Sequence, residues 1–475
     1  MWQRRASGSR YERVSVQDAV NLVSESPAAP MQIALVGVLA ERRPGAGSPD
    51  IHRLRRQVED RVAVLPRLRQ VLLVPRFGGG LPVWTDAPRF AVGEHVVALP
   101  LDPPGDASAI RQACAELVST PLPRDRPLWD LHVLAGAADG DLRIVLRLHH
   151  VLADGETAVR MAGALLGPEM SAGCDAVAAP VPSWPALVLD NARTRAGTLL
   201  RAVRYPGRSL RAADTVVRTI RDGVAVARSG ADHPPTSLNA PVRPGRRVAF
   251  LDLPLPELRA AAHRRGGTLN DAVLTVAGGG VRALLLHRGE PVDRPVAASV
   301  PVSLHAGATD HPAPGEAADG DGRPTAESAN AVGVAVVPLP LCPSSVDRLA
   351  AVAAGSRDAI RAARQTGPIT LFRSSWVLRA ALPLFRRQHL VQLFVTNVRG
   401  PQTTLHLGGA ELLRAYPLAP LNGNVTLGVA VLSYAGGLGL GLVTDRASVP
   451  DVDVVVAGIR EAVGELLADA AQAAI

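Results

Sequence analysis

The sequence contains no lysine, so its formal net charge of +8 is carried by arginine alone. GC-biased coding favours arginine together with the abundant alanine, glycine and proline, so the high isoelectric point says little about a nucleic-acid partner. Aromatic residues make up only 3% of the chain, and no basic run is interleaved with aromatics that could stack on bases. We therefore expect no nucleic-acid partner, and a core built from leucine, valine and alanine.

Cysteine is also scarce. Cys114, Cys174 and Cys342 lie far apart and form no CxxC pair, which argues against a zinc site and a disulfide framework and fits a reducing compartment. Residues 1–15 lack the apolar core of a signal peptide. No stretch reaches the roughly 18 consecutive apolar residues of a membrane-spanning helix. We expect a cytoplasmic protein that is soluble or attached to a surface.

The length of 475 residues favours two domains over a single hydrophobic core. Apolar residues at 47% and charged residues at 20% are typical of a globular chain. Strands and helices alternate along it, and one pair of strands forms a hairpin across residues 435–437, which predicts an α/β fold with mixed sheets. The predicted strands are 31–40, 69–75, 142–150, 246–253, 296–304, 331–339, 391–397, 424–433 and 438–444. The predicted helices are 51–64, 108–118, 156–166, 255–264, 270–287, 345–364 and 451–471.

Composition also predicts where the chain divides. Residues 169–240 begin and end proline-rich and have an arginine-laden middle, so we interpret them as the connection between domains 1–168 and 241–475. Residues 306–329 are small, polar and rich in proline and glycine, which predicts an exposed flexible loop.

Arginines in the connection recur three and four residues apart, for example Arg201, Arg204, Arg208 and Arg211. On a helix, which Pro206 would kink or divide, they form one basic stripe. This stripe is either a solvated face or a patch that docks on anionic lipid headgroups, where each arginine contributes about 1 kcal/mol.

Two adjacent histidines end one predicted strand. Along residues 142–150 side chains alternate, so His150 continues the apolar row while His149 shares the other face with Arg143 and Arg147. That other face points to solvent or to a second layer. An imidazole at the edge of the core is partly desolvated, which favours the neutral form that a general base needs. A purely structural histidine remains an alternative on these residues alone.

Asp154 and Gly155 follow the pair and precede a predicted helix. Asp154 is well placed as its N-cap, and Gly155 allows a sharp turn. Neighbouring histidines point to opposite sides of a strand, so joint metal binding is disfavoured and no metal is expected. The chain has no G-x-S-x-G nucleophile motif and no H-E-x-x-H. The glycines at 437, 439 and 441 lie in a hairpin strand and open no helix, so they predict no dinucleotide site.

Residues 149–155 match the HHxxxDG pattern of the coenzyme-A-dependent acyltransferase superfamily, which includes condensation domains. Further segments resemble the bacterial wax ester synthase/diacylglycerol acyltransferase family, in its order and over nearly the whole chain. They are a Ser15-x-x-Asp18 start, 30–33, 126–129 (RPLW), 236–239 (the family's TPLN with Ser237 replacing proline), 268–274, 300–304, 433–434, 443–445 and 449–451.

The resemblance implies a two-domain fold with a central tunnel between the domains and the histidine motif at its middle. It implies acyl-CoA as a co-substrate, without a further cofactor. His150 would take the proton of a hydroxyl acceptor whose oxygen attacks the thioester, and would then protonate the leaving thiolate. His149 and Asp154 would hold the shape of the catalytic loop.

Two asparagines match other polar motifs of the family and are candidate substrate-binding residues. Asn270 begins a predicted helix, where it could instead be a cap. Asn397 lies in TNVRGP, where the family has SNVPGP, and it could stabilise an oxyanion or close a turn. Arg399 replaces the family's proline in that segment, which puts the stiffness of the turn in question.

These features together predict an O-acyltransferase that moves a fatty acyl group to diacylglycerol, to a long-chain alcohol or to both. A leucine- and valine-rich core can supply the apolar lining that both substrates need. Two alternatives stay open, namely the same chemistry on a sugar or polyketide hydroxyl, and a lipid- or carrier-binding homologue without turnover. We expect a peripheral location at the inner face of the membrane or on lipid droplets.

Overall fold

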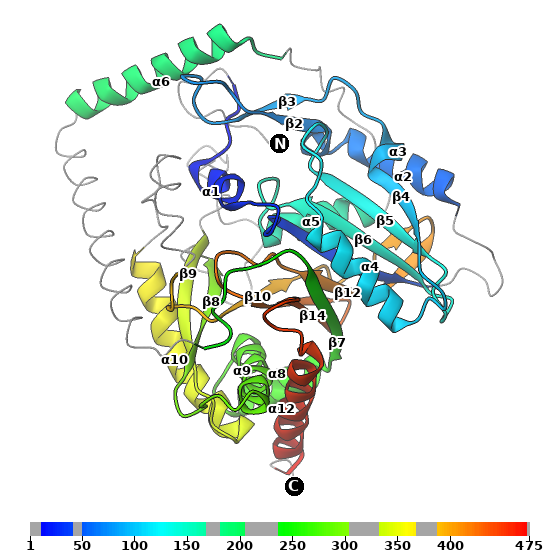
Figure 1. The fold of residues 1–475 in the computed structure, drawn as a ribbon, viewed down its shortest axis with the longest axis vertical. Helices are drawn as coiled ribbons and strands as arrows, with labels where there is room; N and C mark the ends of the chain where they lie inside the picture. The colour runs from blue at the N-terminus through cyan, green and yellow to red at the C-terminus, as the bar shows by residue number, and fades with distance from the viewer. Residues whose placement is uncertain are drawn as a thin grey trace.

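The computed structural model describes residues 11–40, 50–167, 181–204, 236–303, 332–366 and 387–472. Two six-stranded sheets lie side by side, with a separate two-stranded hairpin formed by β2 (Gln70–Leu73) and β3 (Val83–Asp86) (Figure 1). Each six-stranded sheet contains both parallel and antiparallel pairs. The predicted α/β class with mixed sheets is therefore confirmed.

The first sheet has the strand order β11-β12-β1-β6-β5-β4. Its central strands β1 (Gln32–Leu39) and β6 (Leu142–His149) pair antiparallel, with Gln32 opposite His149. On its other side β1 pairs with β12 (Ala410–Leu418), so a segment from the C-terminal third completes the sheet that carries the histidines. The remaining strands are β4 (Val96–Pro100), β5 (Trp129–Ala135) and β11 (His406–Leu407).

The second sheet has the order β7-β14-β13-β10-β8-β9. Strand β10 (Leu393–Arg399) runs parallel to both neighbours, and the other pairs are antiparallel. The predicted hairpin is confirmed, because Ala435 and Gly436, both with positive φ, turn the chain between β13 and β14 as a two-residue hairpin requires. The other strands have the bounds β7 (Arg246–Leu253), β8 (Val296–Ser303), β9 (Val332–Leu339), β13 (Leu427–Tyr434) and β14 (Gly437–Asp445).

Helices cover the first sheet on both faces. Residues of α2 (Ile51–Ala63) and α5 (Gly155–Leu166) share one apolar cluster with β5 and β6. Residues of α4 (Ala107–Ser119) share another cluster with β1, and this cluster also includes Val248 of β7 and Val443 of β14. Helix α4 therefore lies where the two sheets approach each other. The N-terminal α1 (Val16–Ser24), the short α3 (Val92–His95) and η1 (Pro66–Arg69) complete this half.

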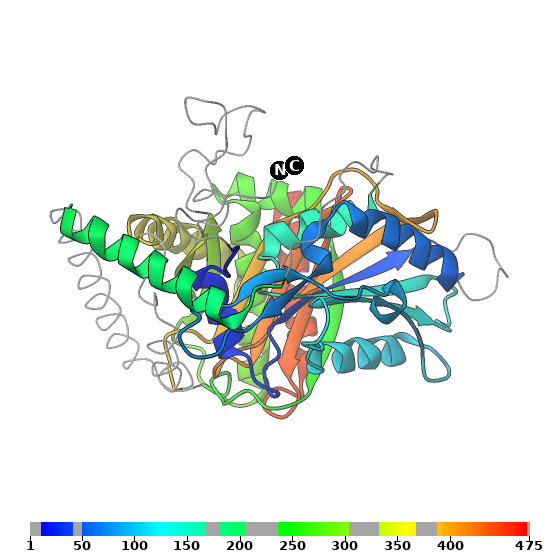
Figure 2. The same cartoon turned by 90° about the horizontal axis from the view of Figure 1, so that it is seen from above.

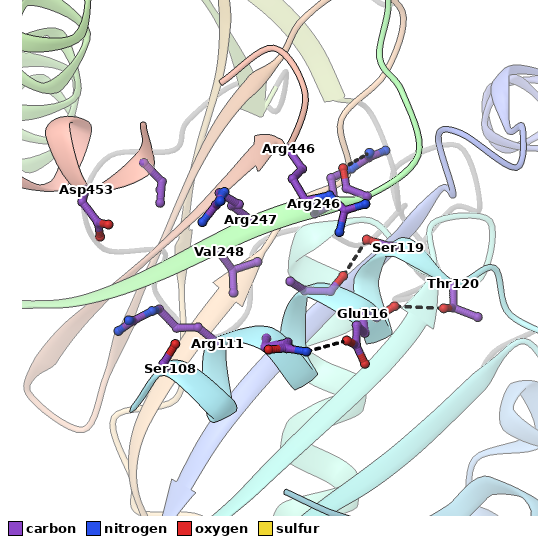
Figure 3. Close-up of a pocket in the computed structure, with 14 residues that line it drawn as sticks. Ser108, Arg111, Glu116, Ser119, Thr120, Arg246, Arg247, Val248, Arg446 and Asp453 are labelled. Atoms are coloured by element: carbon purple, nitrogen blue, oxygen red, sulfur yellow. Dashed lines mark hydrogen bonds between the residues drawn. The ribbon is translucent and has the colours of Figure 1, made fainter. Parts of the chain in front are cut away.

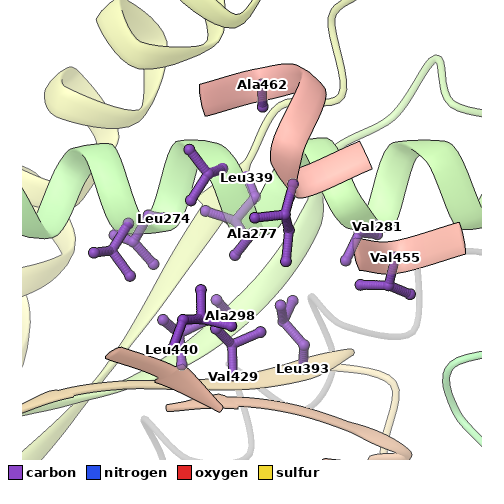
Figure 4. Packing of buried hydrophobic residues seen from close by; sticks show 14 of the residues in the cluster. Leu274, Ala277, Val281, Ala298, Leu339, Leu393, Val429, Leu440, Val455 and Ala462 are labelled. Carbon is purple, nitrogen blue, oxygen red and sulfur yellow. The ribbon is translucent and has the colours of Figure 1, made fainter. Parts of the chain in front are cut away.

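The second sheet is covered by α8 (Leu255–Arg264), α9 (Leu269–His287), α10 (Ser345–Thr366) and α12 (Val452–Gln472). Helix α9 lies between the sheet and α12, so it needs apolar side chains all round (Figure 4). Glycines allow the close approach, since a Cβ at Gly458 would lie 2.8 Å from the carbonyl oxygen of Gly279. By length and composition α9 could cross a membrane, yet 72% of its apolar window is buried inside the protein, which identifies a core helix.

Within the predicted connection 169–240 the structure describes α6 (Trp184–Arg204), which extends away from the body of the molecule (Figure 2). Leu200 and Val203 on this helix are exposed. Most of the predicted arginine stripe and the predicted loop 306–329 lie outside the described residues.

Candidate functional site

The histidine turn lies where β6 ends. The strand stops at His149, and residues 150–154 turn the chain into α5. The backbone N–H of His150 donates to Met31 O at 2.8 Å, which ties the turn to the start of β1. Asp154 caps α5 as predicted, because its side chain accepts from the N–H of Thr157 at 2.8 Å. Both ends of the turn are thus held by hydrogen bonds.

His149 is a buried structural group with an exposed fraction of 1%. Its Nδ1 accepts from the N–H of Val151 at 3.0 Å, so the proton of the neutral ring lies on Nε2, 3.2 Å from Glu25 Oε1. Burial, together with the positive charges of Arg124 and His150, lowers the pKa of His149 to about 3. The ring is therefore neutral at physiological pH, and both of its nitrogens have partners.

The face of β6 that carries His149 lies against a second layer, which was one of the two predicted possibilities. Arg147 donates to both carboxylate oxygens of Asp130, at 2.8 and 2.6 Å, and to the carbonyl oxygens of Leu117 and Thr120 at the end of α4. Gln32 donates to the same two carbonyls. Because α4 covers this face, Arg147 is buried in the middle of β6 with its charge paired by Asp130.

His150 differs from His149 in being partly exposed and in lying one residue beyond the strand. The side-chain amide of Asn21 lies 3.3 Å from both its Nδ1 and its carbonyl oxygen. Asn21 lies on α1, one turn beyond Asp18 of the Ser-x-x-Asp start, and sequence reasoning did not select it. The only signal was its spacing from that start.

A carboxyl group lies close enough to the histidine turn to interact with it electrostatically. Burial raises the pKa of Asp18, while the hydrogen bond from Ser15 and the charge of His150 act in the opposite direction. Ser15 Oγ donates to Asp18 Oδ2 at 2.6 Å and caps α1. The predicted Ser-x-x-Asp start thus contributes to the surroundings of His150.

An apolar cavity of about 70 Å³ lies beside the turn on the α5 face of the first sheet. Leu148 and Gly155, which flank the turn, both line it, and its far wall is formed by β10 and β13. Val398 closes tightly over Gly155, since a Cβ at that position would lie 3.2 Å from Val398 Cγ2. The lining is almost wholly hydrocarbon, which suits an acyl chain and excludes charged groups.

The two predicted asparagines lie on the other half of the molecule. Asn397 is in β10 between Thr396 and Val398, which both line the cavity, so alternation turns the Asn397 side chain to the opposite face of the strand. Asn270 is in the first turn of α9, but the cap is Thr268, which forms a capping box with Asp271. In the described ranges no hydrogen bond joins either side chain to the histidine turn.

Arg399, at the position of the family's proline, is exposed at the end of β10 and pairs in register with Ser433. The following turn is fixed by Gly400, whose N–H donates to Ser433 O at 2.8 Å. A Cβ at Gly400 would lie 2.4 Å from that oxygen, so the glycine determines the geometry of this turn. The turn therefore accommodates Arg399 at the preceding position. Among the residues that the structure describes, no group of three or more His, Cys, Asp or Glu side chains could hold a metal ion.

Known protein families and relatives match this sequence over most of its length. The family model of the wax ester synthase/diacylglycerol acyltransferase catalytic domain matches residues 14–273, and the model of its C-terminal domain matches residues 328–467. A putative diacylglycerol O-acyltransferase of Mycobacterium tuberculosis is 30% identical over 478 aligned residues, which cover 96% of this chain and 90% of that protein. A probable diacylglycerol O-acyltransferase of the same species is 28% identical over 89% of each chain.

Solved structures show the same fold. The wax ester synthase/diacylglycerol acyltransferase from Marinobacter aquaeolei superposes with a TM-score of 0.66 at 20% identity, covering 97% of this chain and 100% of that one. The starter condensation domain of rhizomide synthetase, in complex with C8-CoA and Leu-SNAC, has a TM-score of 0.55 at 18% identity, covering 98% of this chain and 95% of that one. The two family models together match most of the chain, and a relative at 30% identity is covered over 90% of its length, so this chain belongs to the wax ester synthase/diacylglycerol acyltransferase family.

Proposed function

We propose that the protein is an acyl-CoA-dependent O-acyltransferase that forms triacylglycerol from diacylglycerol, wax ester from a long-chain alcohol, or both. The observation that carries this proposal is the position of His150, partly exposed at the turn whose flanking residues line a hydrocarbon cavity. The family membership and the named activities of the relatives support the same chemistry.

In the proposed reaction His150 Nε2 takes the proton of the acceptor hydroxyl as its oxygen attacks the thioester carbonyl carbon. The tetrahedral adduct then collapses, the C–S bond breaks, and the imidazolium returns the proton to the coenzyme A thiolate. For this step the free base must be at Nε2 and the proton at Nδ1. In this scheme Asn21 Nδ2 donates to the carbonyl oxygen of His150, at 3.3 Å, and holds the residue in place, while Nδ1 keeps its proton.

Other groups position the base in this scheme. His149 and Asp154 hold the two ends of the turn, and neither contacts substrate. The cavity beside α5 receives part of the acyl chain and belongs to a tunnel between domains 1–168 and 241–475, which 169–240 connects. Asn270 and Asn397 contribute to substrate binding from the second half of the chain. The enzyme acts in the cytoplasm, at the inner face of the membrane or on lipid droplets, and needs no cofactor beyond acyl-CoA.

The test supplies the purified protein with labelled palmitoyl-CoA and either dioleoylglycerol or hexadecanol, and separates the lipid products. We expect product from at least one acceptor, and a loss of about 10²–10⁴-fold in kcat for His150→Ala. Circular dichroism should remain that of the wild type, because His150 is only half-buried and lies outside the strand. Wild-type turnover by His150→Ala would refute the mechanism, and coenzyme A release without either product would indicate a different hydroxyl acceptor.

A further inference from the structure

A second and much larger cavity, of about 770 Å³, lies on the opposite side of the first sheet from the apolar cavity. We call it the arginine groove. One wall is α4, and the other is the start of β7 together with Arg446 and the beginning of α12 (Figure 3). Four arginines line it against two carboxylates, so its lining is cationic. They are Arg111, Arg246, Arg247 and Arg446, with Glu116 and Asp453.

Three of these arginines are available to a ligand. Within the described ranges, no hydrogen bond or ion pair engages the guanidinium groups of Arg111, Arg247 and Arg446. Arg246 is different, because its guanidinium donates to the carbonyl oxygens of Ala28, Arg243 and Gly245 and forms part of the wall. In the described ranges Glu116 forms no ion pair with these arginines, and its carboxylate accepts from the neutral amide of Gln112 on its own helix at 3.1 Å.

The backbone at Gly245 leaves room for the guanidinium group of Arg446. The guanidinium of Arg446 lies over Gly245, where a Cβ would be 2.9 Å from Arg446 Nε. Gly245 also has φ +92°, which disfavours any side chain. Arg446 therefore lies at the end of the groove near Ser119 and Thr120, while Arg111 lies toward the other end of α4 (Figure 3). Eight residues separate Arg111 and Ser119 on this helix, which corresponds to roughly 12 Å.

The groove borders the segment that holds both histidines. Arg246 donates to Ala28 O at 2.7 Å, and Glu25 and Met31 on either side of Ala28 bind His149 and the N–H of His150. The end of α4, which forms the groove wall, is bound by Gln32, the strand partner of His149. Residues 25–32 therefore connect the groove to the histidine turn, and the groove lies on the face of the first sheet opposite the acyl cavity.

We propose that the arginine groove binds the phosphate groups of the nucleotide end of acyl-CoA, so that the donor approaches along the α4–β7 side and its acyl chain ends in the cavity by α5. Coenzyme A carries phosphates on both sides of its ribose, which fits guanidinium groups spread along an elongated groove. This assignment rests on the proposed use of acyl-CoA, and it adds the side of the molecule from which the donor enters.

The test uses the full chain and adenosine 3′,5′-bisphosphate, which has phosphates on both sides of the ribose and no acyl chain. Isothermal titration should detect its binding, and Arg111→Ser, Arg247→Ser and Arg446→Ser should each weaken it about tenfold. The same changes should raise KM for palmitoyl-CoA by a similar factor, with the loss appearing in KM and not in kcat. The matched control is Arg259→Ser, which changes an exposed arginine on α8 that has no hydrogen-bond or ion-pair partner among the described residues, and it should behave as wild type.

Bisphosphate affinity that is unchanged in all three variants would overturn the assignment. So would loss of binding to vesicles containing phosphatidic acid with unchanged bisphosphate affinity and KM, because the groove would then bind a lipid headgroup. Failure of the proposed function is distinguishable from both outcomes. In that case the wild type would bind the bisphosphate, the variants would not, and no acyl transfer to any hydroxyl would be seen.

Discussion

Glu25 is the acceptor on which the histidine turn depends, and its replacement provides a sharp test of that arrangement. Its Oε1 lies 3.2 Å from both His149 Nε2 and the N–H of Met31, and its Oε2 pairs with Arg124. Glu25→Ala leaves two donors without partners, on residues that are 1% and 6% exposed. Each orphaned donor costs about 1–3 kcal/mol, so we expect the free energy of unfolding to fall by about 2–6 kcal/mol.

The structure also predicts what two related variants should do. Arg124→Gln removes only an ion pair whose arginine side chain is 45% exposed, so it should cost about 0–1 kcal/mol. Glu25→Gln keeps an oxygen for His149 and Met31 and loses only the charge, so its effect should resemble that of Arg124→Gln. The assay is urea unfolding followed by circular dichroism, with kcat measured in parallel. If Glu25→Ala were as stable as Arg124→Gln to within about 0.5 kcal/mol, the proposed role of Glu25 would be wrong.

Two further predictions concern pH and the acyl cavity. Burial lowers the pKa of His149 from its usual 6.5 to about 3, so the unfolded chain binds a proton at this residue before the folded chain does. The contribution of His149 to stability is therefore complete above pH 6.5 and is lost as the pH falls toward 3, by about 1.4 kcal/mol per pH unit. When the free energy of unfolding is measured against pH in this range, His149→Asn should have a shallower slope than the wild type. An identical slope would contradict this. Ala158→Leu adds three carbons to the cavity lining, which should displace about two methylene groups of the bound acyl chain. KM for palmitoyl-CoA should therefore rise about tenfold, and KM for octanoyl-CoA should change much less. Equal effects on both donors would place the acyl chain elsewhere.

Local patterns were sufficient to predict most of the secondary structure. Strand β6, helix α5 and the N-cap Asp154 are encoded within a few neighbouring residues, because side-chain alternation, helical periodicity and capping act over that range. The strands that sequence reasoning missed, such as β5 and β12, carry buried or paired polar groups that break the apolar pattern. In β5, Asp130 is paired with Arg147 of the neighbouring strand. Such pairing becomes visible only in the assembled sheet.

The fold class, the histidine turn and its N-cap could be predicted from the sequence, since each is encoded by local patterns of neighbouring residues. The difference between the two histidines depends instead on tertiary contacts. His149 is held in place because α4 covers its face and Glu25, far away in the sequence, accepts a hydrogen bond from its Nε2, while His150 lies beyond the strand beside Asn21 and the apolar cavity. The arginine groove likewise exists only where α4 meets β7. Contacts between distant segments follow from how helices and sheets pack, and no local pattern of residues encodes them.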